Sequence, residues 1–109
     1  EMERDFTYID DIVNGVTKII EKNIDSREHY KIYNIGNNKT ESLQNFINTI
    51  EIAMGKKAIK EMYPMQQGDV PRTFADVDDL IKDFDYKPNT KLAEGIAVFV
   101  KWYREFYAK

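Results

Sequence analysis

The stretch Arg4-Asp5-Phe6-Thr7-Tyr8-Ile9-Asp10-Asp11 decides how this 109-residue chain begins to fold. Its first six residues include several β-formers whose side chains alternate between two faces, which predicts a short strand over residues 4–9. Asp10 and Asp11 then predict the start of a helix, because carboxylates suit the free N–H groups and the positive dipole at that end. The fold therefore opens with a strand followed by a helix.

Farther along the chain, apolar side chains repeat at helical spacing in four places. The first helix is expected to fade near residues 21–23, and the second is expected to follow Thr40 and to end at Gly55. A short helix capped by Asp76 and a last helix that runs from its cap Thr90 to Tyr107 complete the set. The side chains expected to be buried are, helix by helix, Ile12, Val13, Val16, Ile19 and Ile20; Leu43, Phe46, Ile47, Ile50 and Met54; Val77, Leu80, Ile81 and Phe84; and Leu92, Ile96, Phe99, Val100, Tyr103, Phe106 and Tyr107.

Two further strands are expected. Residues 30–35 carry apolar groups on both faces, which is typical of a strand buried between two layers. Residues 58–62 form a weaker, third strand candidate, and residues 63–73 are expected to be a loop. The fold class is therefore α/β, or α+β if the chain is taken alone, with two or three strands and about four helices. Because so narrow a sheet is marginal by itself, we expect it to continue into a partner.

Composition excludes several classes of protein. The net charge of −3 argues against a nucleic-acid-binding protein, which usually presents a basic face. The chain has no cysteine, so it has neither a disulfide framework nor a thiolate metal site, which fits a reducing cytoplasm. No signal peptide is visible at its start, and no apolar run approaches the ~20 residues of a membrane span. Its first residues resemble a cut made inside a longer protein.

Catalytic, cofactor-binding and metal-binding residues are not expected in this chain. The glycines at positions 15, 36, 55, 68 and 95 are too far apart for G-x-G-x-x-G, and no tyrosine precedes a lysine by four positions. His29, the one histidine, is expected at the surface. The acidic pairs at 10–11 and 78–79 lie at or near predicted helix starts, where capping explains them without a metal.

Two polar segments are candidates for ligand binding. Arg4 stands at the mouth of a strand, and its planar guanidinium can grip two phosphate oxygens. The loop over residues 65–73 mixes amides, an acid and an arginine around a flexible glycine. From the residues alone, a surface salt bridge of Arg4 and an ordinary polar loop are the favoured interpretations. The candidate substrate-binding residues are Arg4, Gln66, Gln67, Asp69 and Arg72.

The same segments carry a resemblance to extended short-chain dehydrogenases that act on nucleotide sugars. Residues 4–11 resemble the family's RDFxYIDD signature, and residues 33–37 resemble its YNIGN strand. Residues 65–76 resemble MQxGDVxxTxAD, and residues 86–103 resemble KPxTxxxEGIxxFVxWY preceded by a tyrosine. The matches run in order from residue 4 to residue 107, and the MQxGDV version points to the UDP-glucuronate 4-epimerase group.

The resemblance implies that residues 1–109 are the C-terminal, substrate-binding domain of such an enzyme. In the family, an N-terminal Rossmann domain holds NAD and a Tyr-x-x-x-Lys pair, and hydride leaves and returns to the sugar C4. By analogy, Arg4 would contact the diphosphate of a UDP-sugar and Asp69 the ribose. Related galactose epimerases have an arginine where Gln66 stands here, and relatives usually have a glycine where Asp85 stands.

Three alternatives stay open at this point. The chain could derive from a nucleotide-sugar 4,6-dehydratase or another 4-epimerase, because the catalytic region that would decide is not in the sequence. It could also be a stand-alone binding or interaction domain.

If the Rossmann domain is its missing partner, the isolated chain is expected to be inactive, to bind UDP-sugar weakly and to self-associate through its uncovered apolar surface.

Overall fold

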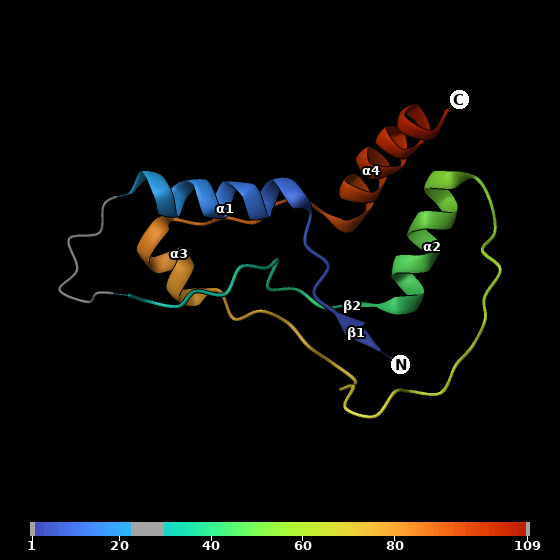
Figure 1. Cartoon of the computed structure of the whole chain (residues 1–109), viewed down its shortest axis with the longest axis horizontal. Helices are drawn as coiled ribbons and strands as arrows, with labels where there is room; N and C mark the ends of the chain where they lie inside the picture. Colours follow the sequence, from blue (N-terminus) through green and yellow to red (C-terminus); the bar gives the residue numbers. More distant parts are fainter. Residues whose placement is uncertain (1, 23–29, 109) are drawn as a thin grey trace.

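The computed structural model describes residues 2–22 and 30–108 and contains four helices and one small sheet (Figure 1). The strands β1 (Glu3–Arg4) and β2 (Glu41–Ser42) pair antiparallel, with Glu3 opposite Ser42. The helices are α1 (Ile9–Glu21), α2 (Leu43–Met54), α3 (Asp78–Phe84) and α4 (Leu92–Tyr107). The expected class, four helices with a two-stranded sheet, is confirmed. His29 lies outside the described residues.

Side chains and backbone at the helix ends explain why the second and third helices start and stop where they do. The Ser42 hydroxyl accepts a hydrogen bond of 3.1 Å from the backbone N–H of Asn45, so Ser42 caps α2 and the predicted cap at Thr40 is wrong. Gly55 ends α2 with a left-handed φ of 66°, as expected. Before α3, the Asp76 carboxylate accepts from the N–H of Asp78, which fits its predicted capping role although Val77 is the cap residue.

The first and last helices begin without the predicted caps. Tyr8 is the cap residue of α1, and Asp10 and Asp11 lie in its first turn rather than before it. Lys91 caps α4, and its N–H donates to the Glu94 carboxylate at 3.3 Å. Thr90 instead donates its own N–H to the buried carboxylate of Asp11 at 3.1 Å. Thr90, which was predicted to cap α4, therefore bonds to α1 instead.

The strand predictions are largely wrong. Only Arg4 of the predicted strand 4–9 lies in β1, and residues 30–35 and 58–62 belong to no strand. A strand exists only where a neighbouring backbone completes its hydrogen bonds. Residues 3–4 find such a neighbour in residues 41–42, whereas residues 30–35 run extended along α3 without a ladder partner in the described chain. Residues 63–73 form a loop, as expected.

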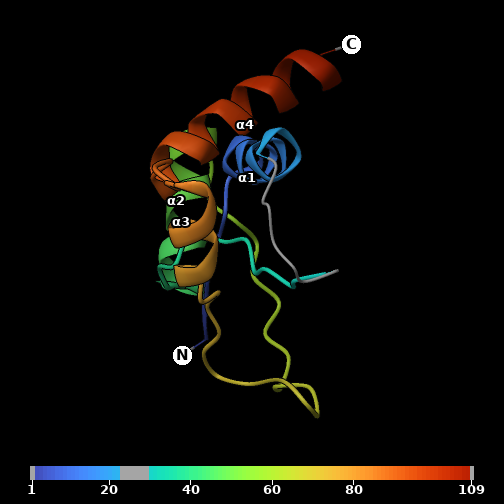
Figure 2. The ribbon, with the colours of Figure 1, turned by 90° about the vertical axis from the view of Figure 1, so that its left-hand side faces the viewer.

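The helices pack in two pairs that the sheet and its flanking segments connect (Figures 1 and 2). On one side, α1 packs on α3 around a core in which Tyr86 and Leu80 are fully buried. On the other side, α2 packs along α4, and the rings of Phe6 and Phe46 stack at 4.0 Å between centroids. Near the C-terminal end of α4, Arg104 donates to the carbonyl oxygen of Met54 at the end of α2 at 2.8 Å, and the last turn of α4 extends past α2 (Figure 2).

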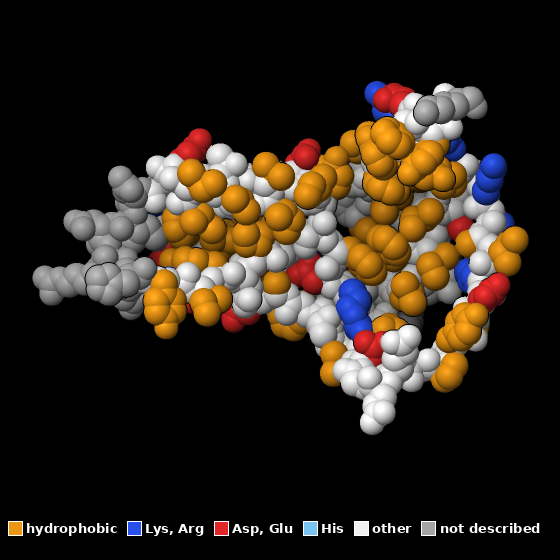
Figure 3. Space-filling model, viewed as in Figure 1, with side chains coloured by type: hydrophobic (Ala, Val, Ile, Leu, Met, Phe, Trp, Pro, Cys, Tyr) orange, Lys and Arg blue, Asp and Glu red, His pale blue; other side chains and the backbone are white. Residues whose placement is uncertain are grey.

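Large apolar surfaces that the sequence expects to be buried are exposed (Figure 3). Of the predicted core, Val77, Leu80, Phe84, Ile96 and Val100 are buried. Periodicity identifies the apolar face of each helix correctly, but burial also needs a neighbour to cover that face. Predicted core residues that are exposed include Val13, Val16 and Ile20 on α1, Leu43 on α2, Ile81 on α3, and Phe99, Tyr103, Phe106 and Tyr107 on α4.

Candidate functional site

Arg4 lies where the N-terminal strand meets the loop of residues 63–73. Its Nη1 donates to the carbonyl oxygen of Glu3 at 2.8 Å and to that of Pro71 at 3.3 Å, and its Nη2 lies 4.0 Å from a carboxylate oxygen of Asp69. The Arg4 side chain is 27% exposed and that of Asp69 is 46% exposed. The fold thus brings together two of the predicted site residues and leaves both accessible to a ligand.

The turn before Asp69 carries the two candidate amides. The N–H of Asp69 donates to the carbonyl oxygen of Gln66 at 3.1 Å, and Gly68 closes the turn with a φ of 94°. Glycine suits this position because a side chain disfavours a positive φ. Gln66 and Gln67 are exposed on the turn, so their amides are available to a polar ligand beside Asp69.

Arg72 is held by partners of its own. Its Nε lies 3.1 Å from the Glu3 carboxylate, and its Nη2 donates to the Thr40 hydroxyl at 3.2 Å. The backbone beside it is also fixed, because the N–H of Glu3 donates to the carbonyl oxygen of Pro71 at 2.8 Å. Arg72 therefore joins the loop to β1 and to the segment before β2, with one side of its guanidinium already engaged.

Asp5 organises this site, a role that we did not predict from the sequence. Its carboxylate accepts hydrogen bonds from the N–H groups of Asn37 and Asn38, both at 2.9 Å, and from that of Ala75 at 3.2 Å. The Thr7 hydroxyl donates a further bond at 3.0 Å. Its position in the Arg4-Asp5-Phe6 motif was the one feature of the sequence that singled it out. Its partners, Asn37, Asn38 and Ala75, are far away in sequence and come near only in the folded chain.

Beneath the site, Gly36 is surrounded closely. A Cβ at this position would lie 2.5 Å from the Cβ of Ala75 and 2.9 Å from Oδ2 of Asp5, so only glycine fits without a shift. The carbonyl oxygen of Gly36 accepts a hydrogen bond from the buried hydroxyl of Tyr86 at 3.0 Å. Burial, followed by the charges of Asp11 and Asp5, raises the pKa of Tyr86 to about 12, so its hydroxyl remains a donor at neutral pH.

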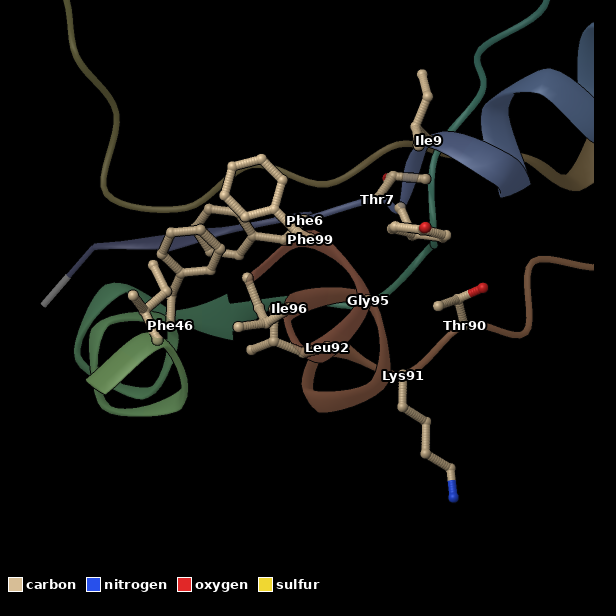
Figure 4. Close-up of a pocket in the computed structure, with 12 residues that line it drawn as sticks. Phe6, Thr7, Ile9, Phe46, Thr90, Lys91, Leu92, Gly95, Ile96 and Phe99 are labelled. Carbon is tan, nitrogen blue, oxygen red and sulfur yellow. The ribbon is translucent and has the colours of Figure 1, made fainter. Parts of the chain in front are cut away.

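An apolar hollow of about 330 Å³ opens between the N-terminal segment, α2 and α4 (Figure 4). Its lining includes no carboxylate, and the side chain of Lys91, its one charged lining residue, points away from it. Such a lining offers dispersion contacts to an uncharged group and no acid or base for catalysis. Apolar residues that line it are Phe6, Phe46, Ile50, Leu92, Ile96 and Phe99.

Other kinds of site are not found in the part of the chain that the structure describes. Within residues 2–22 and 30–108, no cluster of three or more acidic, histidine or cysteine residues could hold a metal ion. In the same residues, no helix has the length and apolar character needed to cross a membrane. The arrangement around Arg4 and Asp69 is therefore the candidate site.

Known proteins match nearly all of the chain, although no family model does. Protein CapI of Staphylococcus aureus is 42% identical over 122 aligned residues, which cover 99% of this chain and 36% of that protein. A probable UDP-glucuronate 4-epimerase of Rhizobium meliloti is 39% identical, with the same coverage of 99% and 36%. A solved structure of UDP-glucuronic acid 4-epimerase from Bacillus cereus, in complex with UDP-glucuronic acid and NAD, matches 97% of the chain with a TM-score of 0.84 and 27% identity.

The fold and the motifs are thus similar to part of a class of solved enzymes, the UDP-sugar epimerases crystallised with NAD. Within this class the chain is similar to part of the UDP-glucuronate 4-epimerases, which confirms the resemblance predicted from the motifs. It spans about a third of the length of the relatives and structures described above, 36% of both relatives and 33% of the solved structure. Its five glycines are too widely spaced for the phosphate-cradling loop of a dinucleotide site.

Proposed function

We propose that this chain is the UDP-sugar-binding part of a UDP-glucuronate 4-epimerase and that residues 1–109 form one substrate-binding domain. In this proposal Arg4 contacts the diphosphate and Asp69 the ribose hydroxyls. Gln66 and Gln67 supply amides from the same turn, and Arg72 supplies positive charge at its edge. A separate stretch of polypeptide provides the NAD-binding domain and the Tyr-x-x-x-Lys pair, so the chain alone does not turn over the sugar.

The single observation that carries this proposal is the pairing of Arg4 with Asp69. Their charged groups lie 4.0 Å apart at a partly exposed position, although 65 residues separate them in the sequence. A guanidinium is the side chain best suited to a diphosphate, because its donors match two phosphate oxygens at once. A carboxylate beside it can accept from the two hydroxyls of a ribose. The pair therefore suits a nucleotide, with its phosphate and sugar side by side.

The uncovered face of α1 supports the second half of the proposal. Val13, Val16 and Ile20 on this helix are exposed, as are Tyr30 and Ile32 in the neighbouring extended segment. Figure 3 shows apolar side chains gathered over α1. A continuous apolar surface of this kind marks an interaction site. We assign it to the NAD-binding domain, which would cover it and add its sheet to the extended residues 30–35.

The test is an NMR titration of the backbone amides with UDP and with UDP-glucuronate. We expect the largest shift changes at residues 4–5 and 66–72. Arg4→Gln is expected to weaken UDP binding about tenfold, the effect of losing one charge-assisted hydrogen bond. The matched control is Lys101→Gln, which removes one positive charge from the exposed surface of α4 and should leave UDP affinity unchanged.

Two results would contradict the proposal. Shift changes confined to residues outside the Arg4–Asp69 site, with UDP affinity unaltered in Arg4→Gln, would show that the site binds no nucleotide. Epimerisation of UDP-glucuronate by this chain alone would show that catalysis does not need a further domain.

A further inference from the structure

The carboxylate of Asp5 is the meeting point of three segments that are distant in sequence. One oxygen accepts from the N–H of Asn37 and from the Thr7 hydroxyl, and the other accepts from the N–H groups of Asn38 and Ala75. All four bonds measure between 2.9 and 3.2 Å. A carboxylate can accept this many bonds because each oxygen has two lone pairs.

Each segment that Asp5 joins also carries part of the candidate nucleotide site. Asp5 follows Arg4 directly, and Ala75 ends the segment whose Pro71 carbonyl oxygen accepts from the Arg4 guanidinium. Asn38 leads to Thr40, whose hydroxyl accepts from Arg72. The Asp5 carboxylate therefore fixes the relative positions of the three backbones on which the charged groups of the site stand.

We propose that Asp5 is a positioning residue for the nucleotide diphosphate: it holds the Arg4 guanidinium in place by locking residues 37–38 and 75 onto the strand that carries Arg4. This inference rests on the proposed function. Neighbouring side chains in an extended segment point to opposite sides, so Asp5 can hold the frame while Arg4 remains free to meet a ligand. Asp5 itself contacts no ligand.

The variant Asp5→Asn probes this role with little change in side-chain size. An asparagine has one carbonyl oxygen, and its NH₂ group would face backbone N–H donors. At least one backbone N–H therefore loses its acceptor at residue 5, and the strand that carries Arg4 is held less firmly against its neighbours. We expect UDP affinity to fall by about five- to tenfold, approaching the loss in Arg4→Gln, because much of the Arg4 contact would be lost.

A double-mutant cycle separates positioning from a general loss of structure. UDP dissociation constants are measured by NMR titration for the unaltered chain, Arg4→Gln, Asp5→Asn and the double variant, at a temperature where all four are folded by circular dichroism. If Asp5 acts through Arg4, the double variant binds UDP no more weakly than Arg4→Gln. If the two losses multiply, Asp5 does not act through Arg4 and the inference is overturned.

Two other aspartates serve as controls. Asp10→Asn makes the same change at an exposed position five residues along, and UDP affinity should not change. Asp11→Asn alters a buried carboxylate that accepts from the N–H of Thr90, so it should lower stability without coupling to Arg4. If Asp11→Asn couples to Arg4→Gln as strongly as Asp5→Asn does, the effect of Asp5 on UDP affinity is a general loss of structure, and the inference is overturned.

A second variant keeps the test valid if Asp5→Asn does not fold. Thr7→Val removes only the hydroxyl that donates to Asp5 at 3.0 Å, and we expect about a twofold loss of UDP affinity that disappears in the Arg4→Gln background. A loss that persists in that background counts against positioning. If Arg4→Gln binds UDP as tightly as the unaltered chain, the proposed function is overturned, and the Asp5 inference with it. If Arg4→Gln loses affinity and this loss multiplies with that of Asp5→Asn in the double variant, only the Asp5 inference is overturned.

Discussion

The hydroxyl of Tyr86 donates a hydrogen bond of 3.0 Å to the backbone carbonyl oxygen of Gly36, although 50 positions separate the two residues. Tyr86 has a relative exposure of 0%. One edge of its ring faces Gly15 of α1 so closely that a Cβ there would lie 3.1 Å from it. Tyr86 thereby joins the core between α1 and α3 to the segment that Asp5 holds beside the candidate site.

We predict that Tyr86→Phe lowers the free energy of unfolding by about 1–2 kcal/mol, because the buried carbonyl oxygen of Gly36 loses its donor. Urea denaturation monitored by circular dichroism measures the change. Tyr107→Phe makes the same substitution at a side chain that is 60% exposed and should change the free energy of unfolding by less than about 0.5 kcal/mol. Equal effects of the two substitutions would contradict a stabilising bond at Tyr86.

The raised pKa of Tyr86 predicts a loss of stability in alkali. Its pKa is about 12 in the folded chain against 10.0 in the ordinary case, so the protonated form is favoured by folding. This contribution is fully present below pH 10, falls as the pH rises from 10 to 12, and amounts to roughly 2–3 kcal/mol. Urea denaturation of the unaltered chain and of Tyr86→Phe over this pH range measures this contribution. The difference between their free energies of unfolding should shrink or reverse as the pH rises. A difference that stays constant with pH would contradict the prediction.

Asp85, at the position where relatives usually have a glycine, ends α3 in a left-handed conformation with a φ of 52°. Asp85→Gly should stabilise the chain by about 0.5–1 kcal/mol, because glycine adopts this conformation without steric cost. The substitution also removes an exposed ion pair with Lys87, which contributes little. Thermal unfolding measures the gain. Asp79→Gly inside α3 should show the opposite sign, and a lower midpoint for Asp85→Gly would contradict strain at this residue.

The uncovered apolar face of α1 predicts self-association of the isolated chain. A patch on the order of several hundred Å² invites association in water. Sedimentation velocity should show an average mass that rises with concentration, and Ile20→Glu, at a residue 77% exposed on α1, should reduce that rise. Ile59→Glu places the same charge on a residue 98% exposed in the loop after α2 and should have a smaller effect. A monomer at all concentrations would contradict this prediction.

The four helices could be predicted from sequence because a helix completes its backbone hydrogen bonds within itself. The stripes that begin at Ile12, Leu43, Val77 and Leu92 each identified a helix, and Gly55 marked the end of α2. The caps were less certain. Thr90 looks like a helix cap in sequence, yet its N–H meets Asp11, 79 residues away, and no local pattern records that contact.

The pattern of residues by itself predicted the four helices and the loop over residues 63–73. The sequence motifs by themselves indicated the likeness to nucleotide-sugar epimerases and the candidates Arg4 and Asp69. Tertiary structure alone decided that residues 30–35 form no strand, that Arg4 faces Asp69 and that Asp5 joins three segments. The physical reason is the range of the interactions. Helical bonds span four residues and can be predicted from local periodicity, whereas strand pairing and carboxylate-to-backbone bonds need partners that folding alone brings near.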